Sequence, residues 1–204
     1  GKFTIGANGV WTYTMDTAHN EFVAGTTYTD TLTVAAADGT THVLTVNILG
    51  TNDGPPLHAA DDIIITNNIK NSTYLIPDWA LLANDSGSSL DVTAVSAQSG
   101  LTADLTTSPS YVTIHEGSTV GGSFNYTASD GSSTSTAHVT VSQDTGTING
   151  GSADEILISN SSSTAMNGYE GNDILIGNNG NDRLNGGDGN DILEGGASAD
   201  NFVF

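Results

Sequence analysis

Hydrophobic and polar residues follow two different periodicities along the chain. Up to about residue 143 they alternate over short stretches, as in Trp11, Tyr13 and Met15, which are separated by Thr12 and Thr14. Alternation of this kind predicts β-strands with one buried face. Beyond residue 144 the apolar residues recur every nine positions instead. The two periodicities predict an all-β protein in which ordinary antiparallel sheets are followed by a repeat structure.

Residues 1–56 form the first expected unit. The alternation continues at Leu32 and Val34 and again in residues 44–48, and Asp38-Gly39 between these two strands is a strong hairpin signal. The Gly and Pro residues at 50–56 are typical of a domain boundary. We therefore expect antiparallel strands in a unit that spans residues 1–56.

Residues 57–143 form the second expected unit. Alternation predicts strands around four groups of residues, which are Leu90, Val92 and Ala94; Val112 and Ile114; Phe124, Tyr126 and Ala128; and Ala137, Val139 and Val141. Asp130-Gly131 predicts the last hairpin, and residues 77–85 predict a single helical turn. Short strands separated by turns at this spacing indicate an immunoglobulin-like β-sandwich.

The nine-residue periodicity is clearest in residues 168–203, which divide into GYEGNDILI, GNNGNDRLN, GGDGNDILE and GGASADNFV. The eighth place is always apolar, and the sixth place is always an acid. Continued backwards, the same frame puts Leu157 and Met166 in the eighth place and Glu155 and Thr164 in the sixth. The phase therefore holds from Gly150 onward, with two degraded repeats before four good ones.

Each nonapeptide has the features of half a coil. Gly at the first, second and fourth places can supply the positive φ values of a tight turn, and the three residues after the acid can form a short strand with its middle side chain inward. Two halves make an 18-residue coil of a parallel β-roll over residues 144–204. In that roll Asp173 lies above Asp191, and Asp182 lies above Asp200.

Stacked carboxylates about 4.8 Å apart repel one another unless a cation lies between them. Carboxylates and the carbonyls of Gly-rich turns are hard oxygen ligands that favour calcium, whereas magnesium requires a stricter octahedron. The side chain of the sixth place should face the ion, and the third place should offer its carbonyl. The candidate ligands in the roll are Asp173, Asp182, Asp191, Asp200, Gly168, Gly171, Gly177, Gly180, Gly186, Gly187, Asp188 and Gly189.

These repeats resemble the RTX family, whose pattern G-G-x-G-x-D-x-U-x is matched at every place by Gly186 to Glu194. The resemblance implies calcium binding and export by type I secretion. The only core that the pattern offers is one Leu, Met or Phe per half coil, so we expect the roll to be unfolded without calcium and folded with it.

Two further resemblances concern the sandwiches. W-T-Y-T at Trp11 to Thr14, D-G-T at 38–40 and G-T-N-D at 50–53 resemble the VCBS repeat family. This resemblance implies a β-sandwich module over 1–56, and the opening strands that are usual in that family are missing here. A-D-D at 60–62, L-L-A-N-D at 81–85 and F-N-Y-T-A-S-D-G at 124–131 are similar to cadherin-like or bacterial immunoglobulin-like modules of large adhesins. In related tandem modules, acids at such boundaries bind calcium, which makes Asp53 with Asp61 or Asp62 a second candidate site. The alternative is that these acids are ordinary turn residues.

Composition supports an extracellular protein whose partners are cations. Three Lys and Arg face 23 Asp and Glu, a formal net charge of −20, which argues against nucleic acid and anionic membranes as partners. There is no Cys. These features fit a secreted bacterial surface protein that uses metal rather than disulfides, and we expect a monomeric module within a longer chain.

Catalytic motifs are absent from the sequence. The five His residues show no metal or triad spacing, and no nucleophile elbow or phosphate loop is present. The first hypothesis is therefore a calcium-binding, non-enzymatic region of a secreted RTX adhesin. The alternatives are a module that binds a cell-surface glycan or protein, and the non-catalytic tail of a secreted enzyme.

Overall fold

The computed structural model describes residues 1–15, 22–23, 25–50, 55–107, 110–160 and 162–203. Contacts between Cα atoms divide the chain into two compact units, Gly1–Gly54 and Pro55–Phe204. The candidate ligand Asp53 and the proposed boundary residues 51–54 lie outside the described residues. No helix in the described ranges is long and apolar enough to cross a membrane.

The first unit consists of two antiparallel hairpins. Its strands are β1 (Lys2–Ile5), β2 (Trp11–Thr14), β3 (Thr27–Ala35) and β4 (Thr41–Leu49). The Asp38-Gly39 turn joins β3 to β4, as expected, with Gly39 at a φ of +88°. A hydrogen bond of 2.9 Å from the Tyr13 hydroxyl to Asp30 connects the two hairpins. None of the described hydrophobic side chains of this unit is buried, and Trp11, expected in a core, is 39% exposed.

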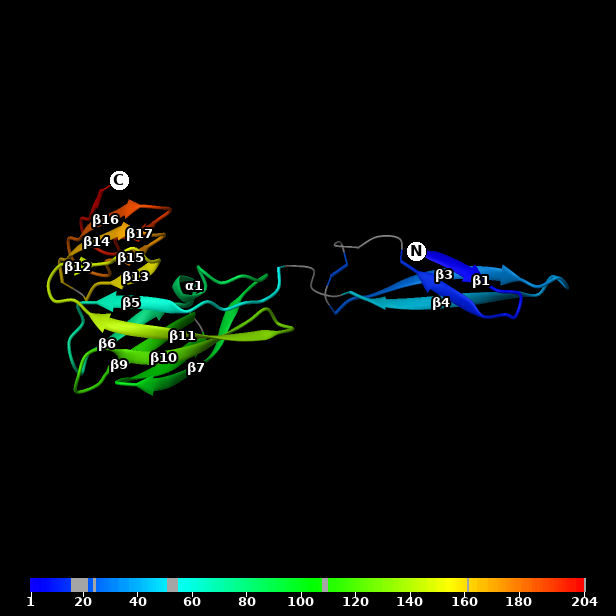
Figure 1. Ribbon diagram of the computed structural model, residues 1–204, viewed down its shortest axis with the longest axis horizontal. Coiled ribbons are helices and arrows are strands. Elements are labelled where there is room, and N and C mark those ends of the chain that lie inside the picture. The colour runs from blue at the N-terminus through cyan, green and yellow to red at the C-terminus, as the bar shows by residue number, and fades with distance from the viewer. Residues whose placement is uncertain (16–21, 24, 51–54, 108–109, 161, 204) are drawn as a thin grey trace. The chain divides into compact units, whose positions relative to one another are not determined.

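The immunoglobulin-like part of the second unit is a sandwich of two sheets (Figure 1). Strands β5, β11, β10 and β7 form one sheet, and β6, β9 and β8 form the other. The bounds are β5 (Asp62–Thr66), β6 (Thr73–Pro77), α1 (Asp78–Leu81), β7 (Asp91–Ser99), β8 (Leu101–Thr107), β9 (Ser110–Glu116), β10 (Gly122–Ser129) and β11 (Thr134–Gln143). The short helix α1 and the hairpin at Asp130-Gly131 are confirmed.

One stretch of the expected alternation is wrong. Val92 is buried, but Ala94 is exposed and Val95 is partly buried. The reason is a register shift in the pairing of β7 with β10 between Thr127 and Ala128, which leaves one extra residue in β7. A bulge of this kind reverses which side chains face the core. Sequence alternation alone also missed β5, β6 and β8. In β5 there is no alternation to see, because three isoleucines follow one another, of which Ile64 lies in the sandwich core and Ile65 packs against the roll core.

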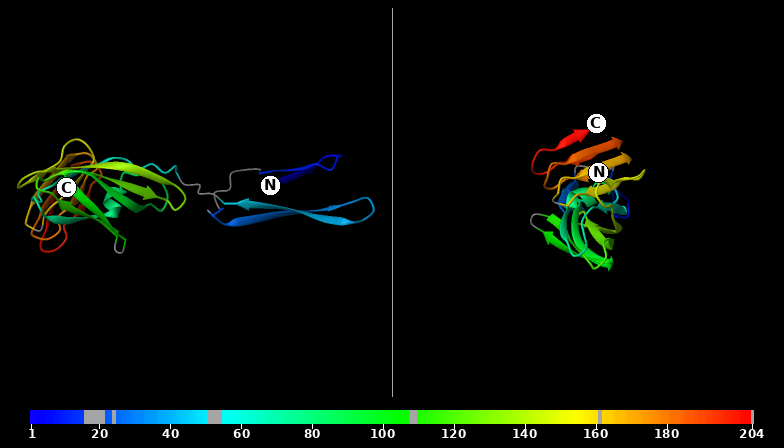
Figure 2. Two further views of the ribbon diagram at one scale, coloured as in Figure 1. Left: turned by 90° about the horizontal axis from the view of Figure 1, so that it is seen from below. Right: turned by 90° about the vertical axis from the view of Figure 1, so that its left-hand side faces the viewer.

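The C-terminal part is a parallel roll of three 18-residue coils. We call residues 150–167, 168–185 and 186–203 the first, second and third coils. The strands are β12 (Ile148–Asn149), β13 (Glu155–Ile158), β14 (Ala165–Glu170), β15 (Ile174–Ile176), β16 (Arg183–Asp188), β17 (Ile192–Glu194) and β18 (Asn201–Val203). Pairing joins each residue to the one 18 positions later, as Ile174 with Ile192 and Leu184 with Phe202. Figure 2 shows these strands stacked in two sheets.

The inside of the roll is a column of eighth-place side chains. Leu157, Met166, Leu175 and Leu184 are fully buried there together with Ile148, and Leu193 packs at the end of the column. The last eighth-place residue, Phe202, is 41% exposed. The nonapeptide frame and its inward-facing place are therefore confirmed over the described residues.

The roll and the sandwich share one sheet. The order β17-β15-β13-β5-β11-β10-β7 runs from the third coil into the immunoglobulin-like part without a break. Strand β5 pairs in parallel with β11 on one side and with β13 on the other, and Figure 1 shows it between them. Ile64 of β5 lies in the sandwich core, whereas Ile65 packs against the roll core.

The outer face of the roll adds a second set of buried side chains that the sequence reading missed. Ile156, Ile158, Ile174 and Ile176, at the seventh and ninth places, belong to the same hydrophobic cluster as the sandwich core. The expectation of one core residue per half coil was wrong here, because the sandwich covers the outer face of β13 and β15. The cover ends at β17, where Ile192 is 46% exposed and Glu194 takes the ninth place.

Candidate calcium site

The sixth-place residues lie in two columns, one on each side of the roll. The first column contains Glu155, Asp173 and Asp191, and the second contains Thr164, Asp182 and Asp200. In each column an Asp accepts a hydrogen bond through Oδ1 from the sixth-place N–H of the preceding coil. These bonds are 2.9 Å from Glu155 to Asp173, 2.9 Å from Asp173 to Asp191, 2.7 Å from Thr164 to Asp182 and 3.0 Å from Asp182 to Asp200.

The second carboxylate oxygen of Asp173 and of Asp182 has no such partner. Oδ2 of Asp173 and Oδ2 of Asp182 are buried and form no hydrogen bond within the described structure. The side chains of both residues are at most 2% exposed. A buried carboxylate oxygen without a partner is costly and calls for an explanation, such as an ion.

The pKa values of the buried aspartates in the two columns also favour a bound cation. Burial raises the pKa of Asp173 to about 6, and the charges of Glu155 and Asp191 add to the rise. Burial also raises the pKa of Asp182, with a further contribution from the charge of Asp200. The protein itself thus disfavours the ionised carboxylates, and a bound cation would reverse this preference.

First-place glycines form the walls around the free oxygens. A Cβ at Gly168 would overlap Oδ2 of Asp173 and the carbonyl oxygen of Gly186, and a Cβ at Gly177 would overlap the carbonyl oxygen of Gly195. The first-place glycines do not have positive φ, so that part of the sequence argument was wrong; they are needed because carboxylate and carbonyl oxygens approach the backbone closely. Positive φ occurs at the second and fourth places, as at Gly187 and Gly171.

The donor set fits calcium. Asp173 and Asp182 each place a free carboxylate oxygen near a backbone carbonyl oxygen, and the column neighbours Asp191 and Asp200 offer further carboxylates. Calcium takes six to eight hard oxygen ligands in a flexible geometry, so carboxylate and carbonyl oxygens of this kind suit it. The third-place side chain of Asp188 is exposed, and its carbonyl accepts the N–H of Gly171 at 3.0 Å. The turn glycines Gly180 and Gly189 have φ values of +116° and +142° and so hold these loops in shape.

The two degraded repeats lack this arrangement. In the first coil the carboxylate of Glu155 turns back to accept the N–H of Gly151 at 3.0 Å. At the other side, Ser159 and Thr164 occupy the first and sixth places, and their hydroxyls are joined by a 2.8 Å hydrogen bond. A hydroxyl pair thus stands where the good repeats have glycine and aspartate.

The second candidate site, at Asp61 and Asp62, shares one feature with the roll, because Oδ2 of Asp62 is also buried without a hydrogen-bond partner within the described structure. Asp61 accepts the backbone N–H of His138 at 2.7 Å. Asp62 is 5% exposed and accepts a bond from Asn84 through Oδ1. Burial, followed by the nearby charge of Asp85, raises the pKa of Asp62 to about 8. No group of three or more His, Cys, Asp or Glu side chains arranged to hold a metal is found among the described residues.

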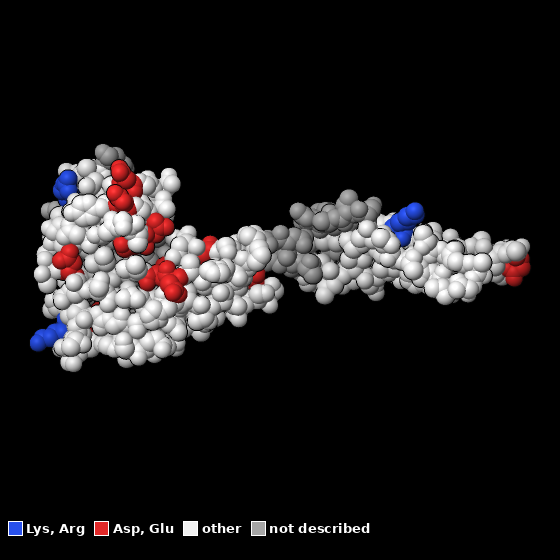
Figure 3. Space-filling model, viewed as in Figure 1, with Lys and Arg blue, Asp and Glu red and all other residues white. Residues whose placement is uncertain are grey.

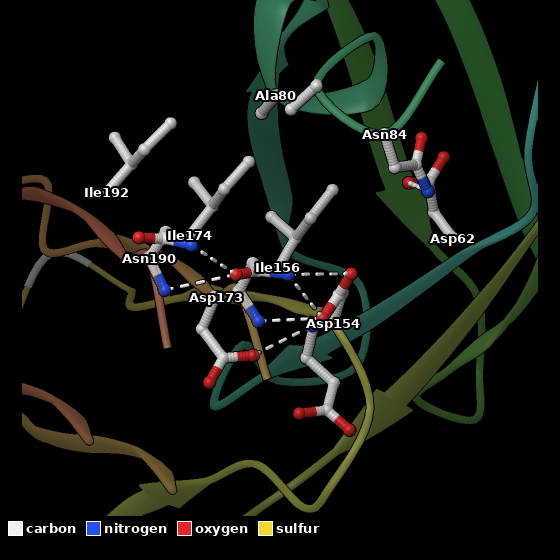
Figure 4. Close-up of a pocket in the computed structure, with 12 residues that line it drawn as sticks. Asp62, Ala80, Asn84, Asp154, Ile156, Asp173, Ile174, Asn190 and Ile192 are labelled. Carbon is white, nitrogen blue, oxygen red and sulfur yellow. Dashed lines mark hydrogen bonds between the residues drawn. The ribbon is translucent and has the colours of Figure 1, made fainter. Parts of the chain in front are cut away.

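A pocket of about 450 Å³ separates Asp62 from the roll (Figure 4). Its lining includes Ile156, Ile174 and Ile192 beside the polar ladder Asp154, Asn172 and Asn190. In the ladder the N–H of Asn172 bonds to Asp154 at 2.6 Å, and the N–H of Asn190 bonds to Asn172 at 3.0 Å. The signal for this ladder in the sequence is the recurrence of Asp154, Asn172 and Asn190 at the fifth place of the repeat. On the face shown in Figure 3, acidic side chains gather over the roll and the adjoining edge of the sandwich.

Fold and site together define a β-sandwich joined to a calcium-binding parallel β-roll. Comparison with known families agrees. Residues 52–142 match the bacterial Ig domain family, and residues 167–202 match four copies of the RTX calcium-binding nonapeptide repeat. The chain thus carries a bacterial Ig-like domain followed by RTX repeats that bind calcium as a structural ligand. Repeats of this family are typical of type I secreted bacterial proteins.

No curated protein matches the chain. Among solved structures it is similar to endo-fucoidan hydrolase MfFcnA4 from glycoside hydrolase family 107 and to a variant of that enzyme. The identity is 16% in both cases, with TM-scores of 0.26 and 0.27, and the match covers 76% of this chain. It spans only about a quarter of the enzyme chains, at 25% and 26% of their length.

Proposed function

We propose that this chain is a non-catalytic region of a large, secreted bacterial RTX adhesin, in which calcium outside the cell folds the roll after type I secretion. The observation that carries the proposal is the pair of buried, unpartnered oxygens on Asp173 and Asp182. Inside a cell, where calcium is scarce, this buried charge opposes folding and keeps the repeats exportable. Outside, calcium at about 10⁻⁴ to 10⁻³ M can occupy the columns.

The adhesin role is supported by the order of the modules. The first unit and the Ig-like domain precede the roll, and the Ig-like domain is joined to the roll through a continuous sheet. Such a join transmits orientation from one module to the next, which suits an extended surface protein. The net charge of −20 favours cations over nucleic acid and anionic membranes.

The test is a calcium titration of the intact chain followed by circular dichroism, with magnesium as the control ion. We expect a cooperative gain of β-sheet signal near millimolar calcium and no gain with magnesium. An unchanged spectrum in calcium, or an equal response to magnesium, would contradict the proposal.

A second candidate, glycan binding, is favoured by one residue. Tyr169 holds a φ of +79° at a place where the repeat pattern has glycine, and its side chain is 52% exposed. It lines a shallow surface pocket with Glu170, Asn185 and Asp188. Aromatic rings beside acids and amides are suited to sugars, and strained residues tend to be functional. Tyr169→Gly should abolish binding on a glycan array while making the roll more resistant to urea; unchanged binding would exclude this site.

A further inference from the structure

The first coil of the roll differs from the later coils in how its buried polar groups are satisfied. Among the described residues of 150–167, no buried side-chain nitrogen or oxygen lacks a hydrogen-bond partner. Glu155 bonds to the Gly151 N–H, and Ser159 bonds to Thr164. The second coil instead contains the two unpartnered oxygens of Asp173 and Asp182. Within the roll, the need for a cation therefore begins after the first coil.

The Ig-like domain supplies the polar contacts that close this coil. The side chain of Asn67, just beyond β5, accepts the N–H of Asn160 at 2.6 Å and donates to the Thr164 hydroxyl at 3.1 Å. The N–H of Asp144 bonds to the carbonyl of Thr66 at 2.9 Å. These bonds replace, at the start of the roll, the contacts that a preceding coil would make.

The same domain also supplies apolar contacts. Strand β13 pairs with β5 over the whole length of β13, from Glu155 opposite Ile63 to Ile158 opposite Thr66. Ile156 and Ile158 are buried in the sandwich core. Figure 1 shows β5 in the position of one more strand of the roll sheet. Because Ile65 packs against the roll core as well, β5 takes the place of a coil strand on both faces of the sheet.

We infer that the Ig-like domain is a built-in template for the roll: its folded edge holds the first coil in place without calcium, and calcium adds the later coils onto it. This inference rests on the proposed calcium-dependent folding of the roll and adds its starting point and direction, from the sandwich towards the C-terminal end. Ser159, Thr164 and Asn67 are the residues that make the first coil independent of the ion.

Hydrogen exchange measured by mass spectrometry on the full chain, in calcium and in a calcium chelator, tests the inference. We expect the amides of β13 and β14 to be protected in both conditions, and those of β16, β17 and β18 to lose at least tenfold protection in chelator. Exchange of β13 and β14 as fast as β17 in chelator would overturn the template and leave the calcium switch intact. Protection of all coils in chelator would contradict the proposed calcium-dependent folding of the roll. It would also remove the expected difference between the first coil and the later coils.

A paired substitution gives a sharper version of the test. Ser159→Gly combined with Thr164→Asp converts the hydroxyl pair into the glycine and aspartate of a good repeat. Protection of β14 should then disappear in chelator and return in calcium. Asn181→Ser, which changes an exposed fifth-place residue of the second coil, serves as the control and should leave β14 protected in chelator. Retained protection of β14 in the paired variant without calcium would overturn the role given to Ser159 and Thr164.

Discussion

The Ig-like domain and the roll differ in how much apolar surface they bury. The sandwich buries a broad apolar cluster, and its buried Glu116 is satisfied by the Tyr74 hydroxyl and the Gly121 N–H. Oδ2 of Asp62 and both carboxylate oxygens of Asp78 nevertheless have no hydrogen-bond partner within the described structure. The second coil of the roll also leaves two carboxylate oxygens without partners, but the roll buries only a narrow column of side chains. The broad apolar burial of the sandwich offsets the cost of its unpartnered oxygens, whereas we expect the later coils to need an ion. The boundary between the two regimes lies within the roll, after the first coil.

The largest expected effect is the loss of folding when a charge is placed inside the roll, compared with the same change on its surface. Leu184→Asp places a charge in the buried column, at a cost of roughly 5 kcal/mol or more. We expect this variant to leave the second and third coils unfolded even in excess calcium, as measured by circular dichroism. The control is Ile192→Asp, which changes a half-exposed seventh-place residue of the third coil. A folded roll in the Leu184 variant would show that the eighth place is not core.

A smaller effect distinguishes the two acids of one repeat. Asp191 belongs to the first column and accepts a hydrogen bond from the N–H of Asp173, whereas the side chain of Asp188 is exposed. Asp191→Ala should raise the calcium concentration at the folding midpoint by about tenfold or more, and Asp188→Ala by less than about twofold. The measurement is the calcium titration described above. Equal shifts in the two variants would refute the register of the columns.

The smallest effect lies in the sandwich and concerns pH. The pKa of Asp62 rises from 3.8 to about 8 on folding, so the folded state binds the extra proton. Its contribution to stability is complete below pH 3.8 and is lost as the pH rises towards 8.

Asp62→Asn should therefore stabilise the sandwich at pH 8 by about 1 to 3 kcal/mol and flatten this dependence, since the buried charge is removed. Urea unfolding of the variant and the parent at pH 5 and pH 8, in chelator, measures this change in the free energy of unfolding. Asp104→Asn, at an exposed strand position where the carboxylate lies 3.3 Å from His115, provides the comparison and should change the stability little at pH 8. An Asp62 variant that unfolds at the same urea concentration as the parent at pH 8 would argue against a buried charge.

Much of the roll could be predicted from the sequence because its geometry is periodic. The eighth-place Leu175 and Leu184, and the sixth-place Asp173 and Asp182, follow from a fixed nine-residue frame that needs no knowledge of distant contacts. The stacking of Asp173 with Asp191 follows from the same frame.

The join to the sandwich could not be predicted in this way. The pairing of β5 with β13 brings together residues about ninety positions apart, and local patterns carry no information on such contacts. One signal was present: Ile occupies the ninth place at 158 and 176, but Glu does so at 194. That change marks where the cover by the sandwich ends. The hydroxyl pair of Ser159 and Thr164 was visible only as a degraded repeat, because its meaning depends on Asn67.

The most direct test of the calcium columns is anomalous X-ray diffraction from crystals of the intact chain grown in calcium. We expect anomalous peaks beside Oδ2 of Asp173 and beside Oδ2 of Asp182, between the second and third coils, and none at the hydroxyl pair of Ser159 and Thr164. Absence of peaks at both aspartates in a folded roll would contradict the calcium columns. A peak at the hydroxyl pair would contradict a first coil that folds without the ion.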